Sequence, residues 1–244
     1  MIVVDRFTKL YGPLPAVQEL SFRVRPGEVL GLIGRNGAGK TTTLRALAGI
    51  IPITAGSLIV GGFDVCHTPL AVKQITAYVA DDPQLFNDLS VVQHLQFTAS
   101  VYGIRNSSEH INELLESFEL TDKRHTAASN LSRGMRQKLG ICSACLSQPR
   151  ALLLDEPLTG LDPQAIRVLK NTIRAMAKQG TAVIVSSHLL AMVEDLCSHA
   201  LILDAGKSKF FGTLKELREH FSQNFAIAGE TTLEHAYFAA LETH

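Results

Sequence analysis

Residues 34–41 read Gly34-Arg-Asn-Gly-Ala-Gly-Lys-Thr41 and fit the pattern G-x-x-x-x-G-K-[ST] at every position. The glycines let the backbone approach a bound group closely, and the N–H groups of such a loop point inward and bind anions. A compact apolar strand over residues 28–33 runs directly into the loop, and a helical pattern begins near Lys40. A strand, a glycine-rich loop and a helix in this order predict an α/β fold with a phosphate-binding loop.

The side chains at the end of this loop supply the chemistry that a nucleoside triphosphate needs. Lys40 places a positive charge on the β and γ phosphates, and the Thr41 hydroxyl is a ligand for Mg²⁺. The positive end of the helix dipole adds to this attraction. We count Lys40 among the catalytic residues and Thr41 among the metal ligands. The residues expected to contact the nucleotide are Gly34, Arg35, Asn36, Gly37, Ala38, Gly39, Lys40, Thr41 and Thr42.

A second apolar strand, Ala151-Leu-Leu-Leu-Asp-Glu156, ends in two carboxylates. A buried parallel strand delivers its last side chains to the carboxyl edge of the sheet, where nucleotides bind. Asp155 is therefore predicted to hold Mg²⁺, directly or through water, and Glu156 to polarise the attacking water. Alone, this pattern is more often just the end of a strand, and the phosphate loop makes it informative.

The rest of the chain predicts a P-loop NTPase core with a mainly parallel sheet, an N-terminal antiparallel β subdomain and an inserted helical subdomain. Residues 1–30 alternate as short antiparallel strands, and residues 83–148 carry helical spacing. Further strands at 151–155, 182–186 and 200–204 alternate with helices at 163–178 and 189–196. We expect a single domain over residues 1–244, with the helical subdomain at about 83–148 and a helical tail at about 213–244.

Composition narrows the possible functions. The 244 residues contain 23 Lys+Arg and 23 Asp+Glu, and this balance predicts no nucleic-acid partner. No apolar stretch approaches the roughly 20 residues that cross a bilayer, and the N-terminus has no secretory pattern, so we expect a cytoplasmic protein. Cys142 and Cys145 form a C-x-x-C without a second pair, which favours a buried helix face over a metal site.

The segment Asn130-Leu-Ser-Arg-Gly-Met-Arg-Gln137 precedes the carboxylate strand. With it, the whole chain resembles the ATP-binding subunit of ABC transporters, whose signature is Leu-Ser-Gly-Gly-Gln or a relative. The resemblance is to the export-type, ABC-2-like branch. It implies ATP and Mg²⁺ as ligands and a head-to-tail dimer, formed by two copies or with a similar ATPase. It also implies an integral-membrane permease as partner, which would hold the protein at the inner face of the membrane.

The resemblance assigns further residues to the site. It implies that Tyr11 stacks on adenine beside Val17 and that His188 contacts the γ-phosphate and orients the attacking water. Asp162, in Leu158-Thr-Gly-Leu-Asp162, would link the two sites of the dimer. The signature residues that would meet the nucleotide of the other subunit are Leu131, Ser132, Arg133 and Gly134.

Each of these residues also has a plainer interpretation. Tyr11 can be an ordinary turn aromatic, and His188 can cap the helix that follows it. Asp162 before a proline is a natural N-cap, as is Ser132. Their joint order along the chain favours the functional interpretation.

Two positions depart from the pattern that the family usually shows. Asp81, in Tyr78-Val-Ala-Asp81, stands where Gln or Glu is usual, and we expect it to meet Mg²⁺ or the attacking water. If the register is shifted, Gln84 is the nearest glutamine. Arg133 and Met135 stand in the signature where Gly and Gln are common, which we interpret as a mark of the subfamily.

The resemblance implies an ATP-hydrolysing motor subunit that drives a separate permease for export. The helical insertion would hold the docking groove beside Asp81. The tail at 231–243 has the spacing of an amphipathic helix, which either belongs to this type of exporter or packs on the core. The alternatives are a nucleotide-dependent clamp and a regulatory scaffold, which the absence of coiled-coil heptads and the presence of Glu156 disfavour. The sequence does not specify the transported substrate.

Overall fold

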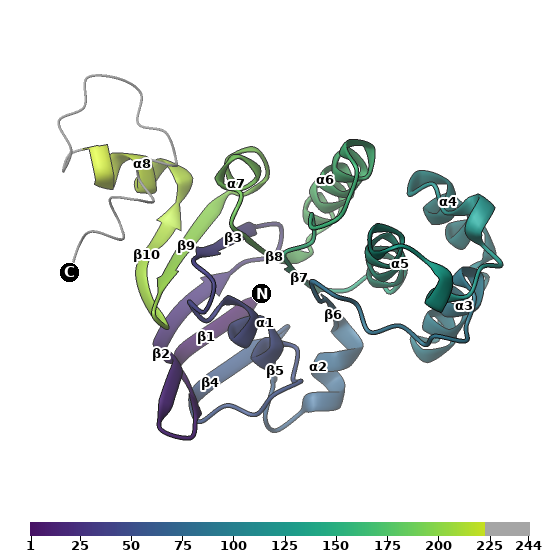
Figure 1. Ribbon diagram of the computed structural model, residues 1–244. Helices are drawn as coiled ribbons and strands as arrows, with labels where there is room; N and C mark the ends of the chain where they lie inside the picture. Colours follow the sequence, from purple (N-terminus) through teal and green to yellow (C-terminus); the bar gives the residue numbers. More distant parts are fainter. Residues whose placement is uncertain (223–244) are drawn as a thin grey trace.

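The computed structural model describes residues 1–222, and the helix predicted over 231–243 lies outside them. A six-stranded sheet with the order β10-β9-β3-β8-β7-β6 forms its centre (Figure 1). Neighbouring strands from β9 to β6 are parallel, and the edge strand β10 is antiparallel, so the predicted mainly parallel sheet is confirmed. Its strands are β3 (Val29–Gly34), β6 (Thr76–Val79), β7 (Ala151–Asp155), β8 (Ala182–Ser187), β9 (His199–Asp204) and β10 (Lys207–Thr213).

A second, four-stranded sheet is antiparallel throughout and has the order β2-β1-β4-β5. Its strands are β1 (Ile2–Tyr11), β2 (Leu14–Val24), β4 (Ala55–Val60) and β5 (Phe63–Asp64). The first two are ten and eleven residues long, so the short strands predicted at the start of the chain form one long hairpin. Irregularities in its register break the strict alternation of the sequence and explain why it resembled shorter strands.

Helices cover both faces of the central sheet (Figure 1). They are α1 (Lys40–Leu47), α2 (Pro69–Ile75), α3 (Val91–Val101), α4 (Ser108–Ser117), α5 (Arg133–Leu146), α6 (Pro163–Lys178), α7 (Leu190–Leu196) and α8 (Leu214–Ser222), with short 3-10 turns at Thr121–Lys123 and Ala128–Asn130. Helices α3, α4 and α5 form an arm beside the β6 edge, which is the helical insertion that the sequence predicts. No helix in this part of the chain combines the length and apolar character needed to cross a bilayer.

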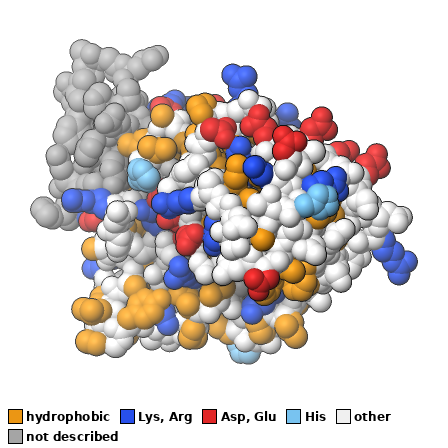
Figure 2. Space-filling view, turned by 45° about the vertical axis from the view of Figure 1, so that its right-hand side comes forward, with side chains coloured by type: hydrophobic (Ala, Val, Ile, Leu, Met, Phe, Trp, Pro, Cys, Tyr) orange, Lys and Arg blue, Asp and Glu red, His pale blue; other side chains and the backbone are white. Residues whose placement is uncertain are grey.

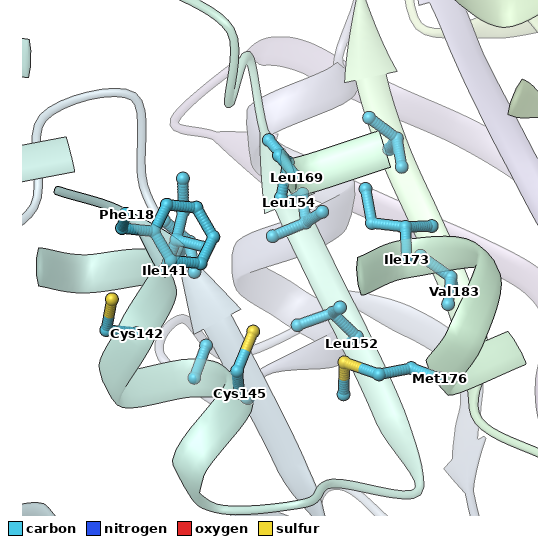
Figure 3. Packing of buried hydrophobic residues seen from close by; sticks show 14 of the residues in the cluster. Phe118, Ile141, Cys142, Cys145, Leu152, Leu154, Leu169, Ile173, Met176 and Val183 are labelled. Carbon is cyan, nitrogen blue, oxygen red and sulfur yellow. The ribbon is translucent and has the colours of Figure 1, made fainter. Parts of the chain in front are cut away.

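Alternate residues of each central strand enter two separate hydrophobic clusters. In β7, Leu152 and Leu154 pack with α5 and α6, as Figure 3 shows. Leu153 faces the opposite way and packs with α1 and the antiparallel sheet. Because both faces are covered, the central stretches of β3, β7, β8 and β9 are almost entirely apolar, which is typical of a buried parallel sheet. Cys142 and Cys145 lie in the first cluster, so their interpretation as a buried helix face is confirmed.

The parallel strands bring distant segments of the chain to one edge of the sheet. In the register of the sheet, Val79 lies beside Leu154, and Asp155 lies beside Ser186. The glycine-rich loop follows β3, Asp81 follows β6, and His188 follows β8. The carboxyl ends of these strands therefore present the predicted site residues side by side.

Candidate functional site

The glycine-rich loop turns tightly between β3 and α1. Gly39 has φ 103°, and a Cβ atom there would lie 2.7 Å from the carbonyl oxygen of Ala16. Only glycine fits this left-handed, closely packed position. The same Cβ would lie 3.0 Å from a side-chain atom of Val17, so Val17 lies next to the loop. We call this loop, residues 34–42, the cradle. It leads directly into the N-terminus of α1, where the first N–H groups of a helix have no partner within the helix.

Lys40, Glu156 and His188 lie together at this cradle. The Nζ atom of Lys40 donates to the carbonyl oxygen of Gly34 at 2.7 Å and lies 3.5 Å from Oε1 of Glu156. The other carboxylate oxygen of Glu156 lies 2.9 Å from Nδ1 of His188. The Glu156 carboxylate thus bridges the lysine and the histidine, and three of the predicted catalytic residues share one cluster.

The backbone of Glu156 is strained. Its φ is 46°, a left-handed conformation that costs a residue other than glycine about 1–3 kcal/mol. Its N–H donates to the Ser186 hydroxyl at 2.9 Å, which holds the turn in place. Strain of this kind is typical of sites where a side chain must be aimed in one direction.

Asp155 is a buried carboxylate held at both oxygens. Ser186 donates to Oδ1 at 2.7 Å, and the Tyr78 hydroxyl donates to Oδ2 at 3.3 Å. Burial raises the pKa of Tyr78 to about 12, so its hydroxyl keeps its proton and acts as a donor. Asp155 forms no direct ion pair with a described residue, and the nearby positive charge of Arg45 acts on both Asp155 and Tyr78.

The residues around Asp155 fit Mg²⁺ that is shared with a nucleotide better than a metal ion held by protein side chains alone. In the described part of the chain no three His, Cys, Asp or Glu side chains cluster as metal ligands. Mg²⁺ typically uses one or two protein oxygens together with the phosphates of its nucleotide. Asp155 and the hydroxyl of Thr41 are donors of this type, at the end of β7 and the start of α1.

The signature residues form a second cluster at the start of α5. Ser132 is the N-cap of this helix and accepts from the N–H of Met135 at 3.3 Å. A Cβ atom on Gly134 would lie 2.3 Å from the carbonyl oxygen of Gly160, so the two loops touch at their backbones. Leu131 is buried beneath them, while Ser132 is exposed. The N-terminus of α5 is therefore accessible from outside the subunit.

Asp81 and Asp162 are held by cations from the same helix. Arg133 lies 3.1 Å from Oδ1 of Asp81, so these two side chains form an ion pair. Lys138 lies 2.8 Å from Oδ2 of Asp162, and this contact holds the pKa of Asp162 below its usual range. Asp162 also caps α6. The partner of Asp81 in this structure is thus Arg133 of the signature segment.

The remaining expected positions lie at the margins of these clusters. Tyr11 is 52% exposed at the end of β1, with the Nζ atom of Lys9 4.9 Å from its ring centre. Gln84, the alternative to Asp81, is exposed and lines a groove between the core and the arm. Sequence reasoning missed Tyr78, Ser186 and Lys138 as supporting residues. Their partners are remote in sequence, and only Ser186, a short polar residue near the end of an apolar strand, offered a local signal.

The fold and the cradle define a P-loop nucleotide-binding protein. The family described as ABC transporter matches residues 17–159. The chain therefore belongs to the ABC transporter family, whose ATP-binding subunits are ATPases that work with membrane permease components.

Individual relatives agree with this family. The chain is 34% identical to the ABC-type transporter ATP-binding protein EcsA of Bacillus subtilis, over 96% of each chain. It is 35% identical to the Nod factor export ATP-binding protein I of Cupriavidus metallidurans, over 86% of this chain and 70% of that one. A solved structure of an ATP-binding subunit of an ABC transporter superposes with a TM-score of 0.93 at 29% identity, covering 99% of this chain and all of that one. These names favour a transporter subunit over the clamp or scaffold alternatives.

Proposed function

We propose that the chain binds Mg²⁺ and ATP in the cradle of residues 34–42 and hydrolyses the nucleotide with Glu156 as the residue that activates water. The observation that carries this proposal is the Glu156 carboxylate, held between Lys40 and His188. Phosphate oxygens would become the partners of Lys40 and release Glu156 toward the attacking water. His188 would fix the direction of the carboxylate. Thr41 and Asp155 would hold Mg²⁺, which neutralises charge on the phosphates.

We propose further that two subunits complete each site head to tail. The support is the exposed N-terminus of α5, where Ser132, Arg133 and Gly134 present N–H groups and a positive dipole to a neighbouring molecule. Tyr11 would face adenine at the rim of the cradle. Asp162, placed by Lys138, would contact the neighbouring subunit close to the signature. The second copy is this chain or a similar ATPase.

The proposed permease contact is a groove between the arm and the core. One part, of about 400 Å³, is lined by Gln84, Leu85 and Tyr102, among others. An adjoining part of about 830 Å³ is bordered by the exposed side chains of Leu70 and Val101. Figure 2 shows hydrophobic side chains along the lower edge of the molecule, where the β1–β2 hairpin, β5 and α2 lie in Figure 1. A helical segment of a permease of the export type fits a surface of this kind.

Two substitutions test the ATPase proposal. Glu156→Gln should keep ATP binding and lower hydrolysis by at least about 100-fold, because a carboxylate that accepts the proton is lost. The variant should then accumulate as an ATP-dependent dimer in gel filtration. Lys40→Ala should lose ATP binding, whereas the control Lys178→Ala changes an exposed lysine on α6 and should retain it.

Two results would contradict these proposals. If Lys40→Ala hydrolysed ATP at the wild-type rate, the assignment of the cradle as the ATP site would be wrong. If Glu156→Gln bound ATP but remained monomeric at every concentration, the proposal that two subunits share each site would be wrong.

A further inference from the structure

Tyr78 lies between the proposed metal site and the groove that separates the arm from the core. Its hydroxyl lies 3.3 Å from Oδ2 of Asp155, the proposed metal ligand. Tyr78 also lines both parts of the groove between the arm and the core. One side chain therefore touches the proposed permease surface at one end and the metal carboxylate at the other.

The register of the sheet places Tyr78 there. Tyr78 in β6 lies directly beside Leu153 in the parallel strand β7, so both side chains point to the same face. Asp155 is two residues beyond Leu153 and points to that face as well. The long tyrosine side chain can therefore reach along β7 to the carboxylate. Its ring packs against the hydrophobic cluster shared by α1 and the antiparallel sheet.

We propose that Tyr78 is a positioning residue that fixes the Asp155 carboxylate for Mg²⁺ and transmits the occupancy of the groove to it. The proposal rests on the proposed function, since it assumes that Asp155 holds Mg²⁺ with the nucleotide. It adds a residue that touches neither nucleotide nor metal and acts through Asp155.

The hydrogen bonds of Asp155 explain why such a residue matters. Ser186 fixes one oxygen at 2.7 Å, and Tyr78 fixes the other, so the carboxylate cannot rotate freely about its last bond. Without the tyrosine hydroxyl, Oδ2 loses a donor in a buried environment, where an unpaired oxygen is costly. A bound segment that displaces the ring would move the hydroxyl with it, because the ring is rigid. The orientation of the metal ligand would then depend on the groove.

The first test replaces Tyr78 by Phe, which keeps the ring in the groove and removes only the hydroxyl. Binding of a fluorescent ATP analogue is measured by titration in EDTA and at increasing Mg²⁺. We expect the affinity in EDTA to match wild type, while the Mg²⁺ concentration for half-saturation rises by about tenfold or more, the usual effect of losing a hydrogen bond behind a metal ligand. Thermal unfolding checks that the variant is folded.

Tyr102→Phe is the matched control. Tyr102 lines the same two parts of the groove, but its hydroxyl donates to the carbonyl oxygen of Lys73 at 3.5 Å. The same chemical change should therefore leave the Mg²⁺ half-saturation unshifted. A wild-type Mg²⁺ response from Tyr78→Phe, or an equal shift from Tyr102→Phe, would overturn the positioning role.

The second test places a large side chain in the part of the groove that helix α5 lines. Ser143 lies on α5 and lines the same part of the groove as Tyr78. Ser143→Trp should shift the Mg²⁺ half-saturation when Tyr78 is present, and should add no further shift in the Tyr78→Phe background. Ser143→Ala serves as the control for loss of the hydroxyl. Shifts that simply multiply in the double variant would overturn the link between groove and carboxylate.

Lys40→Ala, measured in the same titration, separates this inference from the proposed function. If Lys40→Ala keeps wild-type affinity in EDTA and in Mg²⁺, the cradle assignment fails. If Lys40→Ala loses binding while Tyr78→Phe behaves as wild type, the cradle stands and the inference about Tyr78 fails.

Discussion

Arg133 in the signature segment and Asp81 in the loop after β6 form an ion pair with each other. Their side chains are 57% and 48% exposed, so solvent screens the ion pair. The pair joins the loop after β6 to the first turn of α5. A hydrogen bond forms a second link between the same two elements, since Arg136 donates to the carbonyl oxygen of Pro83 at 3.4 Å. The loop that borders the groove is thus attached to the signature helix by two arginines.

We expect Asp81 and Arg133 to be coupled weakly in stability. Asp81→Asn and Arg133→Gln should each lower the free energy of unfolding by about 0.5 kcal/mol, and the double variant should lose no more than either single one. Urea unfolding in low salt measures the cycle, and 1 M salt should abolish the coupling. Fully additive losses at low salt would show that the two side chains do not interact.

At this scale the sequence identified side chains by motif and could not identify those that support them. The Lys40, Asp155 and Glu156 positions are fixed by local patterns, and the structure brings Lys40 and Glu156 together as expected. Tyr78 is 77 residues from its partner Asp155. Lys138 follows the signature but pairs with an aspartate at the start of another helix. Contacts of this kind depend on how strands align, which a single sequence does not specify.

Helices α3 and α5 both begin with a serine N-cap, so the contribution of a cap to helix stability can be compared with its contribution to the proposed dimer. Ser90 caps α3 in a reciprocal capping box with Gln93, and Ser132 caps α5. Both remove an unsatisfied N–H from the first turn. Only the N-terminus of α5 belongs to the proposed dimer interface.

Ser90→Ala and Ser132→Ala should each lower the free energy of unfolding by about 1 kcal/mol, because each loses a cap. In the Glu156→Gln background, only Ser132→Ala should also weaken the ATP-dependent dimer. Chemical denaturation measures the first effect, and sedimentation with ATP measures the second. Equal effects of both substitutions on dimerisation would mean that Ser132 acts only through helix stability.

The elements that the sequence missed are the antiparallel edge strand β10, whose residues are largely polar, and several shorter ones. Helix α2 and strand β6 follow one another over residues 69–79, with no turn signal between them. Strand β6 has four residues, too few to show a period, and it is a strand because β7 pairs with it along its whole length. The longer helix α6 carries clear periodicity, and its predicted range of 163–178 agrees with the structure.

At the scale of the whole molecule, the burial of the cysteines gives a direct test of the packed core. Cys66 is exposed, whereas the other three cysteines are buried. Burial raises the pKa of Cys145 and of Cys197 to about 12, and raises that of Cys142 well above its ordinary value. The reactive thiolate is therefore scarce at these three positions.

A thiol reagent at pH 8 should modify one cysteine rapidly in the native protein and all four after denaturation in urea. Cys66→Ser should remove the rapid phase and leave the fold unchanged, because Cys66 lies outside the core. Absorbance of the released chromophore counts the groups. Rapid modification of two or more thiols in native wild-type protein would show that the core opens readily.

The two hydrophobic clusters on either side of the central sheet also limit how the chain can change in length. Inserting one residue within β7 or β8 would turn every later side chain of that strand to the wrong side and exchange the contents of both cores at once. Insertions and deletions can therefore accumulate only outside the strands, for instance in the turn around Gly103 between α3 and α4. The lengths of the central strands are therefore fixed, and changes in chain length are confined to the segments that connect them.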